Sequence, residues 1–261
     1  AGRADPSAWR ASITAAVLAL APHTATVGGV GMDTHCPTAL LLDDDGEPLA
    51  AGVTWDHPGL IEPTAQLVAA LDPEHRRLVG NHLMPATAMG AAHRLLQLIE
   101  PEAISAATTF GLAGTWLGQW LTGERAIDPT QASYTGLMAS TDGSCRWLTE
   151  VLHELGIPPH HLPPVRPSLS VLGPLRATSA ATLGLPSGIP VMVGSGDTPA
   201  ASYALGTEPG GRPLLIMGTT HVVSNSLAAP DFRAKALQRV DVHAGRWLIN
   251  GVVNGGDALA E

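Results

Sequence analysis

The stretch "PVMVGSGDTPAASYALG", residues 190–206, decides how the rest of the sequence is interpreted. An apolar run breaks at a Gly-Ser-Gly turn, residues 194–196, which is followed by one carboxylate, Asp197, and a helix of small side chains. Both glycines permit positive φ and the close approach of a ligand or another backbone. A carboxylate at the carboxyl end of a strand faces a cleft and can serve as a general base. The alternative is that Asp197 only caps the helix.

Composition and charge restrict the classes of function. The chain of 261 residues has room for one or two domains, and 45% hydrophobic with 14% charged residues indicates a globular protein. A net charge of -9 and a single lysine argue against nucleic acid and anionic membranes as partners. No apolar run approaches the ~20 residues of a membrane span, and a signal peptide pattern is lacking. Cys36 and Cys145 are too few for a disulfide framework and are expected in the core, so we expect a cytoplasmic protein.

Hydrophobic periodicity predicts an α/β chain. Asp5 and Pro6 are typical of the start of a helix, which we expect to run to residue 20. The predicted strands are residues 24–32 and 38–50, and the predicted helices that follow are residues 60–71, 86–100 and 113–123. Prolines and glycines indicate mostly loop between residues 155 and 190, with one short helix near residues 178–184. Residues 246–261 form a strand and one helical turn with nothing to cover them, so we expect a fragment.

A second candidate site is "MGTTHVV", residues 217–223, between two predicted strands. The turn of Gly218, Thr219 and Thr220 offers backbone amides and hydroxyls that can hold a phosphate without a P-loop lysine. The alternative is a plain hairpin of β-branched residues. A dinucleotide-binding G-x-G-x-x-G motif is excluded in the Asp197 turn, because Pro199 takes the place of the third glycine.

A third candidate is the polar triplet of Asp33, Thr34 and His35, which interrupts an apolar alternation. Such groups at a strand end can bind sugar hydroxyls, and the alternative is an exposed bend. His153 and the pair at residues 160–161 lack the helical spacing of a zinc site and lie near prolines, so we expect solvated surface and no metal ligands there.

Six segments in the same order resemble the FGGY carbohydrate kinases, closest to the rhamnulokinase-like, ribulokinase-like and xylulokinase-like members. Among them, "LTGERAIDPTQASYTGLM" is similar to the family's Leu-Thr-Gly-Glu and Asp-Pro-Ser-x-Ala-Ser segments, with Thr130 in place of the usual Ser. The other segments are "GMDTHCPTALLLDDDGEPLAAGVTWDH", "GNHLMPATAMGAAHRLLQLIEPE", "LGIPPHHLPPVRPSLSVLGPL", "TLGLPSGIPVMVGSGDTPAASYALG" and "LLIMGTTHVVSNS".

The resemblance implies a ribonuclease H-like, actin-like ATPase fold in which sugar and ATP meet between two domains, with Mg²⁺ on the phosphates. It implies that Asp197 is the general base that accepts the proton of the attacking sugar hydroxyl. The substrate-binding positions implied by the resemblance are Asp33, Thr34, His35, Asp56 and Thr198. The positions implied for ATP are Gly218, Thr219, Thr220, Gly255 and Gly256.

The resemblance also sets expectations for the domains and the partner. Residues 1–206 correspond to the sugar-binding domain without its first strands, and residues 207–261 to the beginning of the nucleotide-binding domain. The family's N-terminal phosphate hairpin and adenosine site are absent, so we expect this stretch alone to turn over slowly or not at all. The segment "TWDHPG" lacks the family's usual arginine, so the resemblance does not decide which sugar is bound. We expect a sugar or polyol as the partner and allow for a homodimer.

Two other classes of function are compatible with these motifs. One is a non-catalytic sugar-binding or regulatory protein with the kinase fold. The other is an unrelated actin-like ATPase whose ATP hydrolysis no sugar stimulates.

Overall fold

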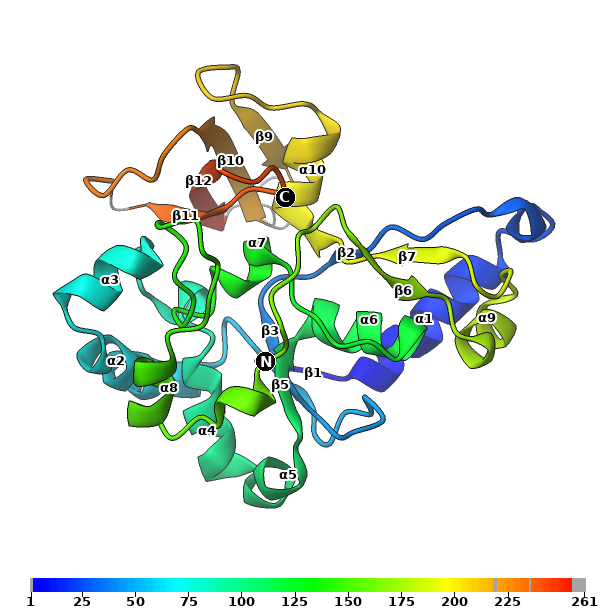
Figure 1. The fold of residues 1–261 in the computed structure, drawn as a ribbon, viewed down its shortest axis with the longest axis horizontal. Helices are drawn as coiled ribbons and strands as arrows, with labels where there is room; N and C mark the ends of the chain where they lie inside the picture. The colour runs from blue at the N-terminus through cyan, green and yellow to red at the C-terminus, as the bar shows by residue number, and fades with distance from the viewer. Residues whose placement is uncertain (1, 218–219, 235, 255–261) are drawn as a thin grey trace, which may run out of the picture.

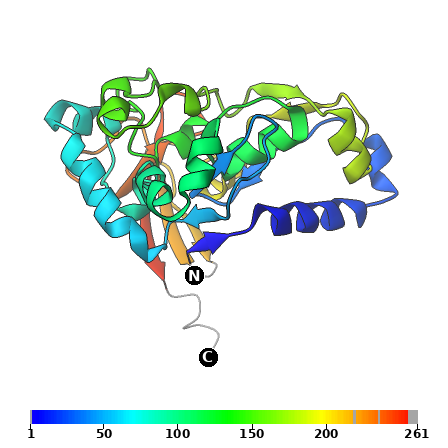
Figure 2. The same ribbon diagram turned by 90° about the horizontal axis from the view of Figure 1, so that it is seen from below.

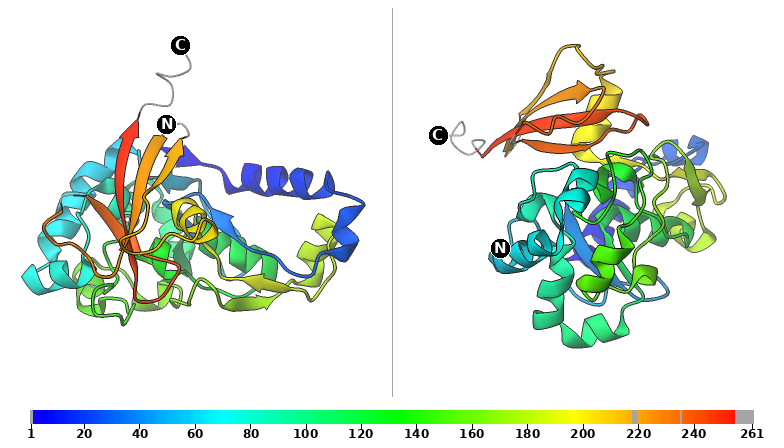
Figure 3. Two further views of the ribbon diagram at one scale, coloured as in Figure 1. Left: turned by 90° about the horizontal axis from the view of Figure 1, so that it is seen from above. Right: turned by 60° about the vertical axis from the view of Figure 1, so that its left-hand side comes forward.

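The computed structural model describes residues 2–217, 220–234 and 236–254. They form a larger body of helices around a four-stranded sheet and a smaller sheet that lies above this body (Figures 1 and 3). A parallel strand pair and an antiparallel hairpin lie outside these two sheets. In the described ranges no helix is long and apolar enough to cross a lipid bilayer.

The sheet of the body is antiparallel, in the order β1 (Arg3–Ala4), β4 (Gly52–Thr54), β3 (Thr38–Leu42) and β5 (Thr109–Leu112). Every residue of β3 is buried, because helices and loops cover both faces of this strand. The accompanying helices are α2 (Ile61–Ala70), α3 (Pro73–Val79), α4 (Ala91–Ile99), α5 (Pro101–Ala106), α6 (Ala113–Thr122) and α8 (Thr149–Glu154). Short 3₁₀ turns occupy Pro58–Leu60 and Pro159–His161.

The first helix, α1 (Pro6–Leu18), begins as its sequence predicts. The Asp5 carboxylate accepts a hydrogen bond from the Ser7 amide at 2.9 Å, which stabilises the helix start. The helix runs along one side of the body, beside α9 (Ala177–Leu183) (Figure 2). Its Trp9 ring lies 5.8 Å from the Trp116 ring of α6. The short helix predicted near residues 178–184 is confirmed as α9.

Two predicted elements differ from the structure. Residues 24–32 are not a strand, since His23–Thr26 forms a 3₁₀ turn and only an isolated bridge from Val30 to Val191 follows. The glycines in this stretch offer no side chains to pack as a strand. The helix predicted from residue 86 begins at Ala91. The amides of Met89 and Gly90 donate instead to the carbonyls of residues 134 and 135, which holds the preceding backbone away from a helix.

The Gly-Ser-Gly turn lies between two short pairs of strands. β6 (Val171–Pro174) and β7 (Pro190–Met192) form an antiparallel hairpin, and β2 (Asp33–Thr34) pairs in parallel with β8 (Ser195–Gly196). Helix α10 (Asp197–Ala204) starts directly after β8, as predicted. The short helix α7 (Pro129–Ala132) packs against β8 and supports this pair from below.

The smaller sheet has the strand order β11 (Leu237–Val240), β12 (Trp247–Asn254), β10 (Thr220–Leu227) and β9 (Leu214–Met217). All its neighbouring strands are antiparallel. The two strands predicted within residues 214–227 are confirmed. The predicted phosphate positions Gly218, Thr219, Gly255 and Gly256 lie outside the described residues, and of Thr220 only the place in β10 is described.

Candidate active site

The parallel pairing of β2 with β8 creates the candidate site. In its register Asp33 is the partner of Ser195 and Thr34 is the partner of Gly196, which brings the polar triplet beside the start of α10. Asp197 is exposed and occupies the first turn of α10, where the partial positive charge of a helix start favours an anion. The N-cap is Gly196, so Asp197 is not the helix cap. One of its carboxylate oxygens accepts the Thr198 amide at 2.6 Å.

The two glycines of the turn have different roles. Gly194 has φ +77°, and a Cβ there would overlap the carbonyl oxygen of Met32. Gly196 has φ -71°, so its backbone does not use the positive φ that a glycine permits. A Cβ on Gly196 would lie 3.1 Å from the Cβ of Cys36 and 3.2 Å from Nη1 of Arg239. The first glycine therefore makes the turn, and the second admits neighbouring side chains next to Asp197.

Two residues of the polar triplet, Asp33 and Thr34, form β2, and His35 directly follows this strand. Asp33 and His35 are exposed, whereas the Thr34 side chain is buried. Burial and the nearby negative charge of Asp197 raise the pKa of Asp33 above its ordinary value. Nδ1 of His35 lies 2.9 Å from the hydroxyl of Thr38, which orients the imidazole ring. The site thus presents two neighbouring carboxylates and an imidazole to solvent.

The other two predicted substrate residues lie differently. Asp56 is exposed after β4 and accepts a hydrogen bond from the Thr54 hydroxyl at 2.5 Å. Thr54 pairs with Thr38 in the sheet, so Asp56 is connected to His35 only through two threonines. The Thr198 side chain is 7% exposed and packs inward from the turn. The strand pairing therefore brings the polar triplet close to the Asp197 turn. Asp56 lies farther along the sheet, and the buried Thr198 does not share the exposed surface.

A buried network below the turn was missed from the sequence. The Gly196 amide donates to the Thr130 hydroxyl at 3.2 Å, and this hydroxyl donates to the Asp128 carboxylate at 2.5 Å. The Gln131 side-chain amide donates to the second Asp128 oxygen at 2.7 Å. Burial raises the pKa of Asp128, although these donors oppose the shift. The signal in the sequence was Asp128 before Pro129, which is typical of the N-cap that starts α7.

Replacing Thr130 with valine tests this support of the turn. We expect Thr130→Val to lower the free energy of unfolding by about 1–3 kcal/mol, because the buried Gly196 amide loses its acceptor and the buried Asp128 carboxylate loses one of its donors. Thr130→Ser keeps the hydroxyl and is expected to retain most of the stability. Urea unfolding of both variants checks the difference, and equal losses in the two would contradict a role for the hydroxyl.

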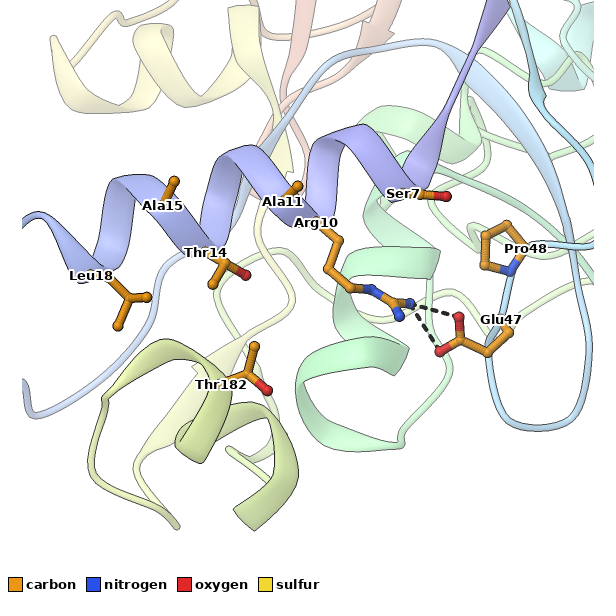
Figure 4. Close-up of a pocket in the computed structure, with 9 residues that line it drawn as sticks. All are labelled: Ser7, Arg10, Ala11, Thr14, Ala15, Leu18, Glu47, Pro48 and Thr182. Atoms are coloured by element: carbon orange, nitrogen blue, oxygen red, sulfur yellow. Dashed lines mark hydrogen bonds and ion pairs between the residues drawn. The ribbon is translucent and has the colours of Figure 1, made fainter.

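Two pockets lie along α1. One, of about 250 Å³, is lined by the polar triplet together with Trp9 and Trp116, but not by Asp197. The other, of about 490 Å³, lies between α1 and α9 (Figure 4). There Arg10 makes two hydrogen bonds of 2.9 Å to the Glu47 carboxylate, and the remaining lining is mostly apolar. Only the smaller pocket therefore contains predicted substrate residues.

Comparison with known proteins decides the family. The model of the FGGY family of carbohydrate kinases, N-terminal domain, matches residues 3–204. The chain belongs to this family. The autoinducer-2 kinase of Escherichia coli (strain SMS-3-5 / SECEC) is 30% identical to it over 210 residues, which are 78% of this chain and 38% of that relative. The chain thus spans about two fifths of the length of this curated relative.

Solved structures agree on the fold of this FGGY chain. The xylulose kinase of Rhodospirillum rubrum superimposes with a TM-score of 0.86 and 27% identity, over 99% of this chain and 54% of that one. The glycerol kinase of Plasmodium falciparum with ADP gives a TM-score of 0.80 over 97% of this chain and 52% of that one. Its 16% identity supports the fold alone. The predicted ribonuclease H-like, actin-like ATPase fold of an FGGY kinase is confirmed.

The histidines and acids of this FGGY chain do not gather into a larger group in the part of the chain that the structure describes. Within the described ranges no group of three or more His, Cys, Asp and Glu side chains converges on one point. His160 and His161 contact each other with ring centroids 4.6 Å apart and lie in the 3₁₀ turn away from β8. The described site presents the exposed Asp197 near Asp33, with the exposed His35 imidazole directly after β2.

Proposed function

We propose that the full-length protein transfers the γ-phosphoryl group of ATP to a hydroxyl of a ketose or polyol, with Asp197 as the general base. The observation that carries this proposal is the parallel β2–β8 pair, which holds the exposed Asp197 next to Asp33. A general base must reach the proton that it abstracts, and an acid at a strand end with a rigid backbone meets this need. Membership in a carbohydrate kinase family supports the same chemistry.

The residues of the chain have separate tasks in this proposal. Asp197 accepts the proton from the attacking hydroxyl, while Asp33, Thr34 and His35 bind other hydroxyls and orient the substrate. Asp56 and Thr198 remain predicted substrate residues with a weaker geometric basis. Phosphoryl transfer depends mainly on positioning and on charge neutralisation, for which ATP arrives with Mg²⁺ on its phosphates. The predicted ATP contacts at residues 218–220 and 255–256 stay predictions.

We assign residues 1–206 to a sugar-binding domain and residues 207–261 to the start of a nucleotide-binding domain. The family model's match to residues 3–204 and the separate sheet β9–β12 support this division. A homodimer and slow turnover of this stretch alone also stay predictions. Because the chain spans only 38% of its first relative, functional tests use the full-length protein.

An ADP-release assay with a panel of substrates tests the proposed reaction. The panel includes autoinducer-2, xylulose and glycerol, together with other ketoses, aldoses and polyols. We expect one substrate class to stimulate ADP release strongly, with a phosphorylated product visible by mass spectrometry. ADP release that no sugar stimulates would support the unrelated ATPase instead. Sugar binding by calorimetry without any ADP release would support the non-catalytic sugar-binding protein.

A further inference from the structure

Arg239 is a buried arginine that reaches from the smaller sheet to the Asp197 turn. It lies in β11 and is 5% exposed. Its guanidinium carbon is 3.6 Å from the centre of the Tyr134 ring, and its Nη1 is 4.0 Å from the sulfur of Cys36. The same Nη1 lies 3.2 Å from the position that a Cβ on Gly196 would take. The guanidinium therefore packs against the residue directly before Asp197.

The charge of Arg239 has no ion partner close by. In the part of the chain that the structure describes, no carboxylate oxygen lies within 4.0 Å of it, and its Nε has no hydrogen-bond partner. Contact with the Tyr134 ring compensates only part of the desolvation of a cation. An apolar side chain of similar size is usually at least as stable in such a place, so stability alone does not explain this arginine.

The groups around Asp197 differ in charge. Asp33 lies near Asp197 in the β2 segment, which His35 and Cys36 follow, while Asp128 is the N-cap of α7 and Tyr134 lies just beyond this helix. Asp33 and Asp128 add negative charge to the region. Burial disfavours the charged form of Arg239, but Tyr134, Cys36 and Asp197 raise its pKa, so it remains a permanent cation. Arg239 thus opposes the field of the neighbouring acids.

We propose that Arg239 is a positioning residue that holds the Gly196 backbone and supplies a fixed positive charge beside Asp197. The positive charge opposes the negative field of Asp33 and Asp128 at the Asp197 turn, and the packing keeps the turn in the geometry needed for catalysis. This inference rests on the proposed function of Asp197 as a general base. Because Arg239 belongs to β11, the proposal also means that the geometry and electrostatic surroundings of Asp197 depend on where the smaller sheet lies.

The test compares Arg239→Met and Arg239→Lys in the full-length protein, with the substrate that the ADP-release panel identifies. Methionine keeps the length and apolar packing without the charge, and lysine keeps the charge. We expect Arg239→Met to lower kcat about 10- to 100-fold with little change in KM for the sugar. The acidic limb of the kcat–pH profile should move to higher pH by up to about one unit. Arg239→Lys should restore the position of this limb.

A matched control is Arg246→Met, since Arg246 directly precedes β12 and pairs with Glu208 at 3.1 Å. It should leave the pH profile unchanged. Thermal unfolding reports whether each variant is folded, and if Arg239→Met is not, the pH profile of Arg239→Lys decides. An unchanged profile and kcat in folded Arg239→Met, or a shifted limb in Arg239→Lys, would overturn the inference. Undiminished turnover of Asp197→Asn would instead reject the base assignment itself.

Discussion

Replacing Asp197 with asparagine in the full-length protein is expected to lower kcat for sugar phosphorylation by about 10²–10⁴-fold, the usual contribution of a general base. Asparagine has nearly the same shape and can still accept the Thr198 amide that the carboxylate holds at 2.6 Å. It cannot take a proton from a hydroxyl. KM for the sugar should therefore change by less than about threefold, because binding is separate from proton removal. Steady-state ADP release measures both constants.

The control for this substitution is Asp45→Asn, which makes the same chemical change at an exposed acid in the turn after β3. Its side chain takes no part in the candidate site, so kcat and KM should stay at the wild-type values. Calorimetry measures sugar binding to Asp197→Asn and shows whether the substrate site remains intact. If Asp197→Asn turned over at a rate comparable to wild type, another group would have to remove the proton.

Replacing Gly194 with alanine is expected to lower the free energy of unfolding by about 2–5 kcal/mol. Left-handed backbone costs an L-residue about 1–2 kcal/mol, and forcing an extra methyl into packed atoms typically adds about 1–3 kcal/mol. Both conditions hold at Gly194, which has φ +77° and would place its Cβ against the Met32 carbonyl. That carbonyl already accepts the Ser195 amide at 3.2 Å. Relief of the overlap therefore requires movement of the strand pair beside Asp197.

Gly245→Ala is the matched control because it isolates the backbone contribution. Gly245 has φ +78°, and nothing lies within 4 Å of the position that its Cβ would take. Gly245→Ala should lower the free energy of unfolding by only about 1–2 kcal/mol. Urea unfolding of both variants gives the difference, which measures the contact with Met32. Equal losses at the two glycines would show that the turn tolerates the methyl group and that the packing argument is wrong.

Elements with strong local signals were predictable from the sequence. Asp5 and Pro6 marked the start of α1, and the alternation of residues 214–227 marked the two strands β9 and β10. Predictions failed where distant backbone competed with local preference. The amides of Met89 and Gly90 bind carbonyls about 45 residues away in the chain, which delays α4, and local periodicity carries no sign of that.

The sequence by itself determined the order of elements, the family resemblance and the choice of Asp197 as the candidate base, because these depend on residue types at close spacing. Tertiary structure decided what surrounds that acid. Asp33 reaches it through a parallel pair that joins segments about 160 residues apart, Thr130 supports its turn from α7, and Arg239 approaches from another sheet. A carboxylate's charge and orientation depend on such neighbours in space, and no local pattern along the chain specifies them.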